Sequence, residues 1–228
     1  MHATFTTLRR LLQPNFAADG ASPGGESAQR TAEQSDSQAV DLALRRYLLY
    51  VVIPLWYVPG VADWWWHRKT KIEETSGTHE SMTHAIMMTV VGAPLLAALL
   101  FDINALVLTL MIAGYVVHEG VTYWDVNYAK NLREVPTIEQ HTHSFLEMLP
   151  FISASLASCL KPKQFAAIFG RGDEPARWKL EPKDPPLTAR YILSVLGGVA
   201  AFVILPYSEE LVRCYRRDRT LKPHHPAQ

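Results

Sequence analysis

Five long segments with few or no charged side chains constrain this chain more than any other feature of its sequence. They lie at about 47–66, 82–101, 105–117, 142–160 and 189–206. Stretches of about 20 such residues match the roughly 30 Å hydrocarbon core of a bilayer. A soluble helical protein is the alternative, but its surface helices would carry an amphipathic stripe, whereas these segments are apolar all round. The sequence therefore predicts an all-α integral membrane protein with about five transmembrane helices.

The polar stretches divide the chain into three parts. Residues 1–40 are rich in Ser, Ala, Gly, Gln and Thr and lack apolar periodicity, so we expect a disordered N-terminal tail, with an organellar transit peptide as the alternative. Residues 41–211 form the predicted transmembrane domain. Its loop 161–188 mixes charges, prolines and aromatic side chains, which is typical of a membrane interface. Residues 212–228 form a predicted polar C-terminal tail.

Charge excludes one class of partner and leaves the membrane orientation open. The chain has 22 Lys and Arg against 22 Asp and Glu, which gives a formal net charge of zero. It carries no basic stripe and no Gly-rich phosphate loop, so we predict no nucleic-acid partner. Lys and Arg are nearly evenly divided between the two predicted sides, and the positive-inside rule therefore does not choose an orientation.

Pairs of an acid and a histidine recur at the ends of the first four apolar segments. Each pair is spaced four or seven residues apart, which places both side chains on one face of a helix. The pairs are Asp63 with His67, Glu80 with His84, His118 with Asp125, and Glu139 with His143. In an up-down bundle of the first four helices, all of these ends meet at one membrane face. A metal site in the core of a helical bundle is built in this way.

Glu147 is the acid for which the sequence offers no structural role. It follows His143 by four residues inside an apolar segment, where a charged group usually pairs, lines a polar cavity or binds an ion. Glu80 and Glu139 differ, because an acid at the start of a helix is also favoured by the macrodipole. The candidate metal ligands are Asp63, His67, His84, His118, Asp125, His141, His143 and Glu147. Such oxygen and imidazole donors suit iron, manganese or zinc, as two ions or as one ion with an outer layer of partners.

The histidine spacing resembles that of a known superfamily. His79-Glu-Ser-Met-Thr-His84 is a histidine pair with four residues between, and His118, His141 and His143 follow later in the chain. About a third of the chain is similar in this respect to the membrane-bound fatty-acid desaturases and hydroxylases. The resemblance implies histidine boxes that bind two irons at one membrane face.

Three functional hypotheses remain open from the sequence. The first is a membrane-embedded non-haem enzyme, with two irons, that uses dioxygen and an electron donor to hydroxylate or desaturate a lipid-like substrate, with Tyr123 shaping the pocket. The second is a zinc-dependent membrane hydrolase in which Glu80 or Glu139 acts as general base. The third is a haem-binding electron carrier that uses His84 and His118, or an ion transporter.

Overall fold

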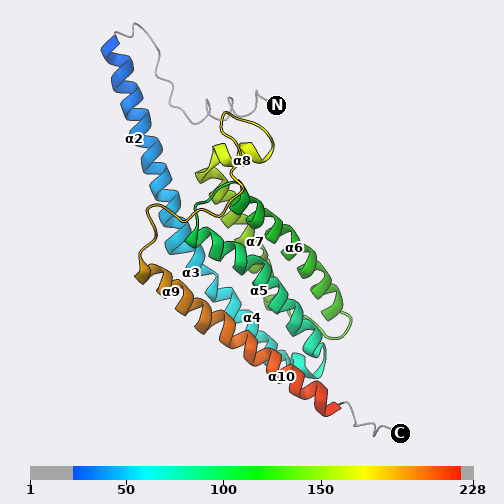
Figure 1. The fold of residues 1–228 in the computed structure, drawn as a ribbon. Coiled ribbons are helices and arrows are strands. Elements are labelled where there is room, and N and C mark those ends of the chain that lie inside the picture. Colours follow the sequence, from blue (N-terminus) through cyan, green and yellow to red (C-terminus); the bar gives the residue numbers. More distant parts are fainter. Residues whose placement is uncertain (1–22, 222–228) are drawn as a thin grey trace. The chain divides into compact units, whose positions relative to one another are not determined.

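The computed structural model describes residues 23–221, with side chains from residue 29 onward, and its long elements are all helices (Figure 1). In chain order they are α2 (Pro23–Tyr47), η1 (Leu48–Val52), α3 (Ile53–Leu55), α4 (Tyr57–Thr70), η2 (Ile72–Glu74), α5 (Gly77–Leu100), α6 (Ala105–Ala129), α7 (Thr137–Leu160), α8 (Pro162–Ile168), α9 (Ala189–Val199), η3 (Ala200–Ile204) and α10 (Leu205–Leu221). The segments η1 and η3 are π-helical turns, and η2 is a 3₁₀ turn. Most of α2 belongs to a separate unit that ends at Ala43, and the packing described below is that of the residues from Leu44 onward.

Within residues 23–221, five helices are long and apolar enough to cross a membrane. They lie within Gln29–Thr70, Gly77–Leu100, Ala105–Ala129, Thr137–Leu160 and Ala189–Leu221. Each contains one of the five apolar segments of the sequence. The all-helical fold class and the number of long apolar helices are therefore confirmed.

The two predicted tails are more helical than expected. Part of the predicted disordered tail lies in α2, which begins at Pro23, while residues 1–22 lie outside the described part of the chain. Similarly, α10 continues through the start of the predicted polar tail as far as Leu221. Both stretches are polar, but Ala, Glu, Gln and Arg are good helix formers, so low hydrophobicity did not mean absence of structure.

Close packing joins the helices that follow one another in the chain. The four-residue connection 101–104 turns α5 back onto α6, and α7 packs against both α6 and α4. At Gly114 of α6, an added Cβ would lie only 2.5 Å from the backbone oxygen of Val90 on α5. The helix α10 packs against α4 and α5. The C-terminal ends of α4 and α6 therefore lie near the N-terminal ends of α5 and α7, with α10 beside them (Figure 1).

The predicted interfacial loop 161–188 packs on the opposite end, against the turn between α5 and α6. Asp102 accepts hydrogen bonds from Lys161 and Arg177, at 2.9 and 2.7 Å. Partial burial raises the pKa of the Asp102 carboxyl, but the hydrogen bonds from these two cations outweigh burial and leave its pKa below the ordinary value. Gln164 of α8 accepts hydrogen bonds from the backbone N–H groups of Ala105 and Arg177, which ties the loop to the first turn of α6.

Candidate metal centre

The helices α4 and α5 contribute four buried polar side chains near the turn that joins them. Asp63 and His67 lie on one face of α4, and His67 Nε2 is 3.6 Å from Asp63 Oδ1. Glu80 and His84 lie on the first two turns of α5, and a Glu80 carboxylate oxygen is 3.9 Å from His67 Nε2. All four side chains are buried. The spacing of four residues within each pair does place both partners on one helix face.

The helices α6 and α7 close the group from the other side. Asp125 Oδ2 of α6 lies 3.4 Å from His84 Nε2, and Asp125 also accepts a hydrogen bond from the Thr83 hydroxyl. On α7, His143 Nε2 lies 2.8 Å from Asp63 Oδ1. Glu139 Oε1, also on α7, lies 3.5 Å from His67 Nε2. The acid and histidine pairs of four helices therefore converge, although His118 stands apart.

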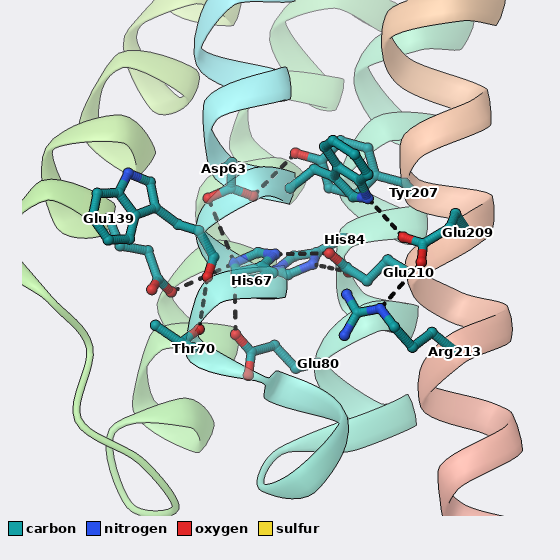
Figure 2. A network of polar contacts seen from close by, with 12 residues as sticks. Asp63, His67, Thr70, Glu80, His84, Glu139, Tyr207, Glu209, Glu210 and Arg213 are labelled. Carbon is teal, nitrogen blue, oxygen red and sulfur yellow. Dashed lines mark hydrogen bonds and ion pairs between the residues drawn. The ribbon is translucent and has the colours of Figure 1, made fainter.

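The fifth long apolar helix supplies the residue that organises the two central histidines. Glu210 of α10 lies 2.9 Å from His67 Nδ1 through one carboxylate oxygen and 3.0 Å from His84 Nδ1 through the other (Figure 2). The two imidazole rings are stacked in parallel, with centroids 4.6 Å apart and an interplanar angle of 3°. A carboxylate only accepts hydrogen bonds, so each Nδ1 must carry the donated proton. In the neutral imidazole, this leaves the lone pair on Nε2.

The Nε2 atoms lack hydrogen bonds on the side away from Glu210. Two buried atoms here, His67 Nε2 and His84 Nε2, make no hydrogen bond to any residue that the structure describes. Native proteins rarely leave buried polar atoms unpaired, and an ion absent from the coordinates is one recognised cause. A histidine that ligates a metal through one nitrogen commonly donates its other N–H to a carboxylate. Glu210 accepts such a hydrogen bond from the Nδ1–H of both rings.

Donor atoms from seven residues form three overlapping groups, each with all of its atoms within 4.8 Å of one another. The groups are Asp63 with His67, His84 and His143; His67 with Glu80 and Glu139; and Glu80 with His84 and Asp125. Asp63, His67 and His143 can be used together without drawing on Glu80, His84 or Asp125. Two positions with three protein donors each are therefore available at the same time.

Arg133 is a buried cation at the edge of this centre. It lies in the connection 130–136 between α6 and α7 and donates hydrogen bonds to both Glu80 and Glu139. Burial lowers the pKa of the Arg133 guanidinium, but the hydrogen bonds to Glu139 and Glu80 outweigh it and raise the pKa above its ordinary value. Arg133 therefore stays charged and ties the carboxylates of α5 and α7 together.

Tyr207 of α10 supports Asp63 from the remaining side. Its hydroxyl lies 3.0 Å from Asp63 Oδ2 and 3.1 Å from the backbone oxygen of Gly60, and it can donate its single proton to only one of them at a time. Because Oδ2 faces Tyr207, Oδ1 faces His67 (Figure 2), and Oδ1 lies 2.8 Å from His143 Nε2. The second residue that α10 contributes therefore orients a third candidate ligand.

Four of the predicted site residues lie outside the donor groups. His118 is buried, and Glu147 partly buried, on the wall of an adjoining cavity. His141 is exposed, and Tyr123 is 76% exposed, so neither side chain faces the centre. His141 follows Glu139 by two residues, and on a helix that step points away from the face that bears Glu139 and His143. His79, from the histidine spacing noted above, stacks on Tyr128 at 4.0 Å instead.

Glu210, Tyr207 and Arg133 were not predicted from the sequence. Glu209 and Glu210 lie three and four residues after the end of the fifth apolar segment, and a fifth crossing ends on the same side as the first and third. That position was a usable signal for Glu210. Arg133 carries no comparable signal, because the sequence shows it only as one more charge in a short connection.

An apolar cavity of about 150 Å³ adjoins the centre. Asp63, His84, Asp125, His143 and Tyr207 form part of its wall, and the remainder is mostly aliphatic and aromatic. Comparisons of the chain with protein-family models, curated proteins and solved structures found no match.

Proposed function

We propose that this chain is a membrane-embedded metalloenzyme, with two irons bound at one membrane face, that oxidises a lipid-like substrate by hydroxylation or desaturation. The observation that carries the proposal is the pair of stacked imidazoles on Glu210. Their Nδ1 atoms are both engaged by one carboxylate, and their Nε2 atoms are buried, make no hydrogen bond within the described residues and face the carboxylate oxygens of Asp63 and Asp125. In this proposal the helices of the centre are transmembrane and α4 to α7 form an up-down bundle.

The charge balance of the buried carboxylates favours two bound cations over one. Five carboxylates are buried in the centre: Asp63, Glu80, Asp125, Glu139 and Glu210. Arg133 offsets one of these negative charges, and within residues 29–221 no other Arg or Lys is ion-paired with them. Buried charges that are not compensated are very costly, so protons or bound cations must balance the other four. Two divalent cations would do so with all three histidines neutral, which is the state in which histidine binds metal.

The donor set favours iron over calcium or magnesium. Imidazole nitrogens mixed with carboxylates suit iron, manganese and zinc, whereas calcium and magnesium prefer oxygen alone. Iron, when bound, would supply the activation of dioxygen. The chain's own part is to hold His67 and His84 through Glu210, to orient Asp63 through Tyr207, and to keep Glu80 and Glu139 in place through Arg133. The resemblance to the desaturase and hydroxylase superfamily is consistent with this assignment.

The cavity favours an apolar substrate. Its wall beyond the centre is largely aliphatic and aromatic, which suits a hydrophobic molecule that is taken from the bilayer. The candidate ligands lie within about two turns of the helix ends at Thr70, Gly77, Ala129 and Thr137. A centre near the membrane surface would remain accessible to water, dioxygen and an electron donor.

Neither alternative from the sequence is favoured by a specific contact. A zinc hydrolase would need a free general base, but Glu80 and Glu139 are both held by Arg133. A haem would need two imidazoles that face one iron from opposite sides, whereas His84 has its Nδ1 on Glu210 and its Nε2 beside Asp125.

Metal analysis of the detergent-purified protein tests the proposal. We expect about two irons per chain, and oxygen consumption that depends on a reductant and on an added lipid-like substrate. His67→Ala should remove most of the bound metal, and His141→Ala, which changes an exposed histidine on α7, is the matched control. Folded protein without iron, manganese or zinc would overturn the proposal. Bound zinc with no oxygen dependence would favour the hydrolase, and a Soret band would favour haem.

A further inference from the structure

The cavity beside the centre follows one face of α5. Its wall there consists of residues spaced three or four apart, as one face of a helix requires: His84, Met87, Met88, Val91, Gly92 and Leu95. From His84 to Leu95 the helix rises about 16 Å. The cavity therefore runs from the metal centre toward the middle of the apolar layer, with its polar wall at one end.

The cavity is narrow. Its volume of about 150 Å³, comparable to that of an engineered cavity that holds benzene, is spread along a helix face of about 16 Å. At its polar end the buried Gly60, one turn before Asp63, has open space where a Cβ would stand, since nothing described lies within 4 Å of that position. A thin chain matches a space that is long and narrow and that continues up to Asp63.

The cavity reaches the outer surface at Gly92, in the middle of α5. Gly92 is exposed although it lines the cavity, and a Cβ there would meet no described atom within 4 Å. Val199 of α9 and Val203 of η3 lie on the wall of the same cavity. π-helical turns such as η3 occur frequently at functional sites. If the helices cross a membrane, this opening faces the hydrocarbon core of the bilayer rather than water.

The polar end is acidic. Asp63, Asp125 and Glu147 line the cavity, and no Lys or Arg of the described chain does so. Asp63 and Asp125 are candidate metal ligands, but Glu147 lies outside the donor groups. An anionic head group, such as a phosphate or a fatty-acid carboxylate, would therefore meet the carboxylate oxygens of Glu147 with no Lys or Arg on the described wall to pair with. A small neutral group that can donate a hydrogen bond, such as a primary hydroxyl, complements these oxygens.

We propose that the cavity binds one single-chain amphiphile with a small neutral head. It enters sideways from the bilayer between α5 and η3, its head lies at the polar end beside Glu147, and its chain extends along α5 past Met88 and Val91. This inference depends on the proposed function only in taking the metal centre as the reacting end. It predicts that the carbons next to the head are the ones oxidised.

Quenching of Trp56 by brominated probes tests the binding mode. Trp56 lines the cavity two helical turns before Asp63, on the side away from the centre. The probes are long-chain primary alcohols with bromine near the hydroxyl or near the chain end, added to the protein in nanodiscs. We expect chain-end bromine to quench more strongly, and Trp56→Phe should remove that difference. The same alcohol should bind more tightly than the fatty acid of equal length.

Two glycine variants provide a matched comparison. Gly92→Leu places a side chain in the opening and should weaken quenching by about tenfold in apparent affinity. Gly197→Leu is the control, because Gly197 is exposed, has open space around its Cβ position and does not line the cavity. Quenching that does not depend on bromine position, equal effects of the two variants, or equal or tighter binding of the acid would overturn the inference. Metal content is measured on the same samples to separate the two proposals. Position-dependent quenching in protein without metal would support the amphiphile-binding cavity and contradict the iron enzyme.

Discussion

At the residue scale, Glu210 has the most informative position in the molecule. It lies on a helix far along the chain from His67 and His84, yet each of its carboxylate oxygens contacts one of their rings. A single carboxylate thus sets the tautomer and the orientation of two imidazoles together. Residues in this supporting position affect metal affinity without touching the metal.

Glu210→Gln should lower metal affinity by about 10- to 100-fold, the range found for the partners of metal-ligating histidines. The amide keeps the shape of the side chain but can accept a hydrogen bond from only one of the two Nδ1–H groups, so the other ring loses its partner. Metal content after dialysis against a graded chelator measures the effect. Glu209→Gln is the control, because the neighbouring Glu209 pairs instead with Trp64, Arg68 and Arg213. Equal loss in both variants would contradict the role given to Glu210.

Glu147 and Asp63 should respond differently to loss of charge. Asp63→Asn removes a candidate ligand and should strongly reduce bound metal. Glu147→Gln should leave metal content unchanged, because Glu147 lines the cavity but lies outside the groups of donors that lie within 4.8 Å of one another. Elemental analysis of both purified variants makes the comparison. Metal loss in Glu147→Gln equal to that in Asp63→Asn would return Glu147 to the ligand set predicted from the sequence.

The sequence predicted which acids and histidines come together better than it predicted what holds them in place. Helical spacing identified Asp63 with His67 and Glu80 with His84, because partners four residues apart share a helix face regardless of the tertiary fold. It could not identify Arg133, since only the folded connection brings that side chain between two carboxylates. Tyr123 was wrongly favoured by its nearness in sequence to Asp125, and two residues along a helix reverse the direction of a side chain.

At the element scale, the contact between α5 and α6 depends on Gly114. An added Cβ would lie 2.5 Å from Val90 O and 3.2 Å from the Pro94 ring, and backbone atoms cannot move aside cheaply. Gly114→Ala should therefore destabilise the protein by about 1–3 kcal/mol, the usual cost of overpacking. Thermal unfolding in detergent measures it. Gly120→Ala on the same helix, where a Cβ meets nothing described within 4 Å, should be neutral or slightly stabilising. A stable Gly114→Ala would show that the helices can separate without cost.

The lengths of the apolar segments predicted the long helices well, whereas the polar composition of the flanking residues predicted the helix ends poorly. The five charge-poor segments each fall within a long helix. The helix α10 extends well past the last apolar residues because its polar turns are held by partners from elsewhere in the chain: Glu210 by two histidines and Arg213 by Glu73. Local hydrophobicity does not reveal such pairs, because their partners are distant in the sequence.

At the scale of the whole molecule, hydrogen bonds to Asp102 hold the loop 161–188 against the end opposite the candidate metal centre. Its pKa is lowered in the folded protein, so its contribution to stability is present above the unfolded pKa of about 3.9 and is lost as the pH falls toward the folded value. Asp102→Asn should lower the melting temperature at neutral pH by an amount that corresponds to roughly 1 kcal/mol. The difference between wild type and variant should shrink as the pH falls below about 4. A difference that stays constant with pH would mean that the carboxylate charge does not matter.

Under the proposed function, removal of the metal should weaken the whole helical unit, because the candidate centre draws side chains from α4, α5, α6, α7 and α10. Without cations, five buried carboxylates face one arginine, and either they repel one another or the histidines must take up protons. An ion that binds only the folded state adds about 2.7 kcal/mol at a free concentration one hundred times its dissociation constant. We therefore expect a chelator to lower the melting temperature and added iron to restore it. Asp63→Asn, which already lacks a ligand, should respond much less to either treatment. Equal stability of the chelated and the untreated wild-type protein would mean that the five helices are held by the histidine and carboxylate pairs alone, with no ion in the centre.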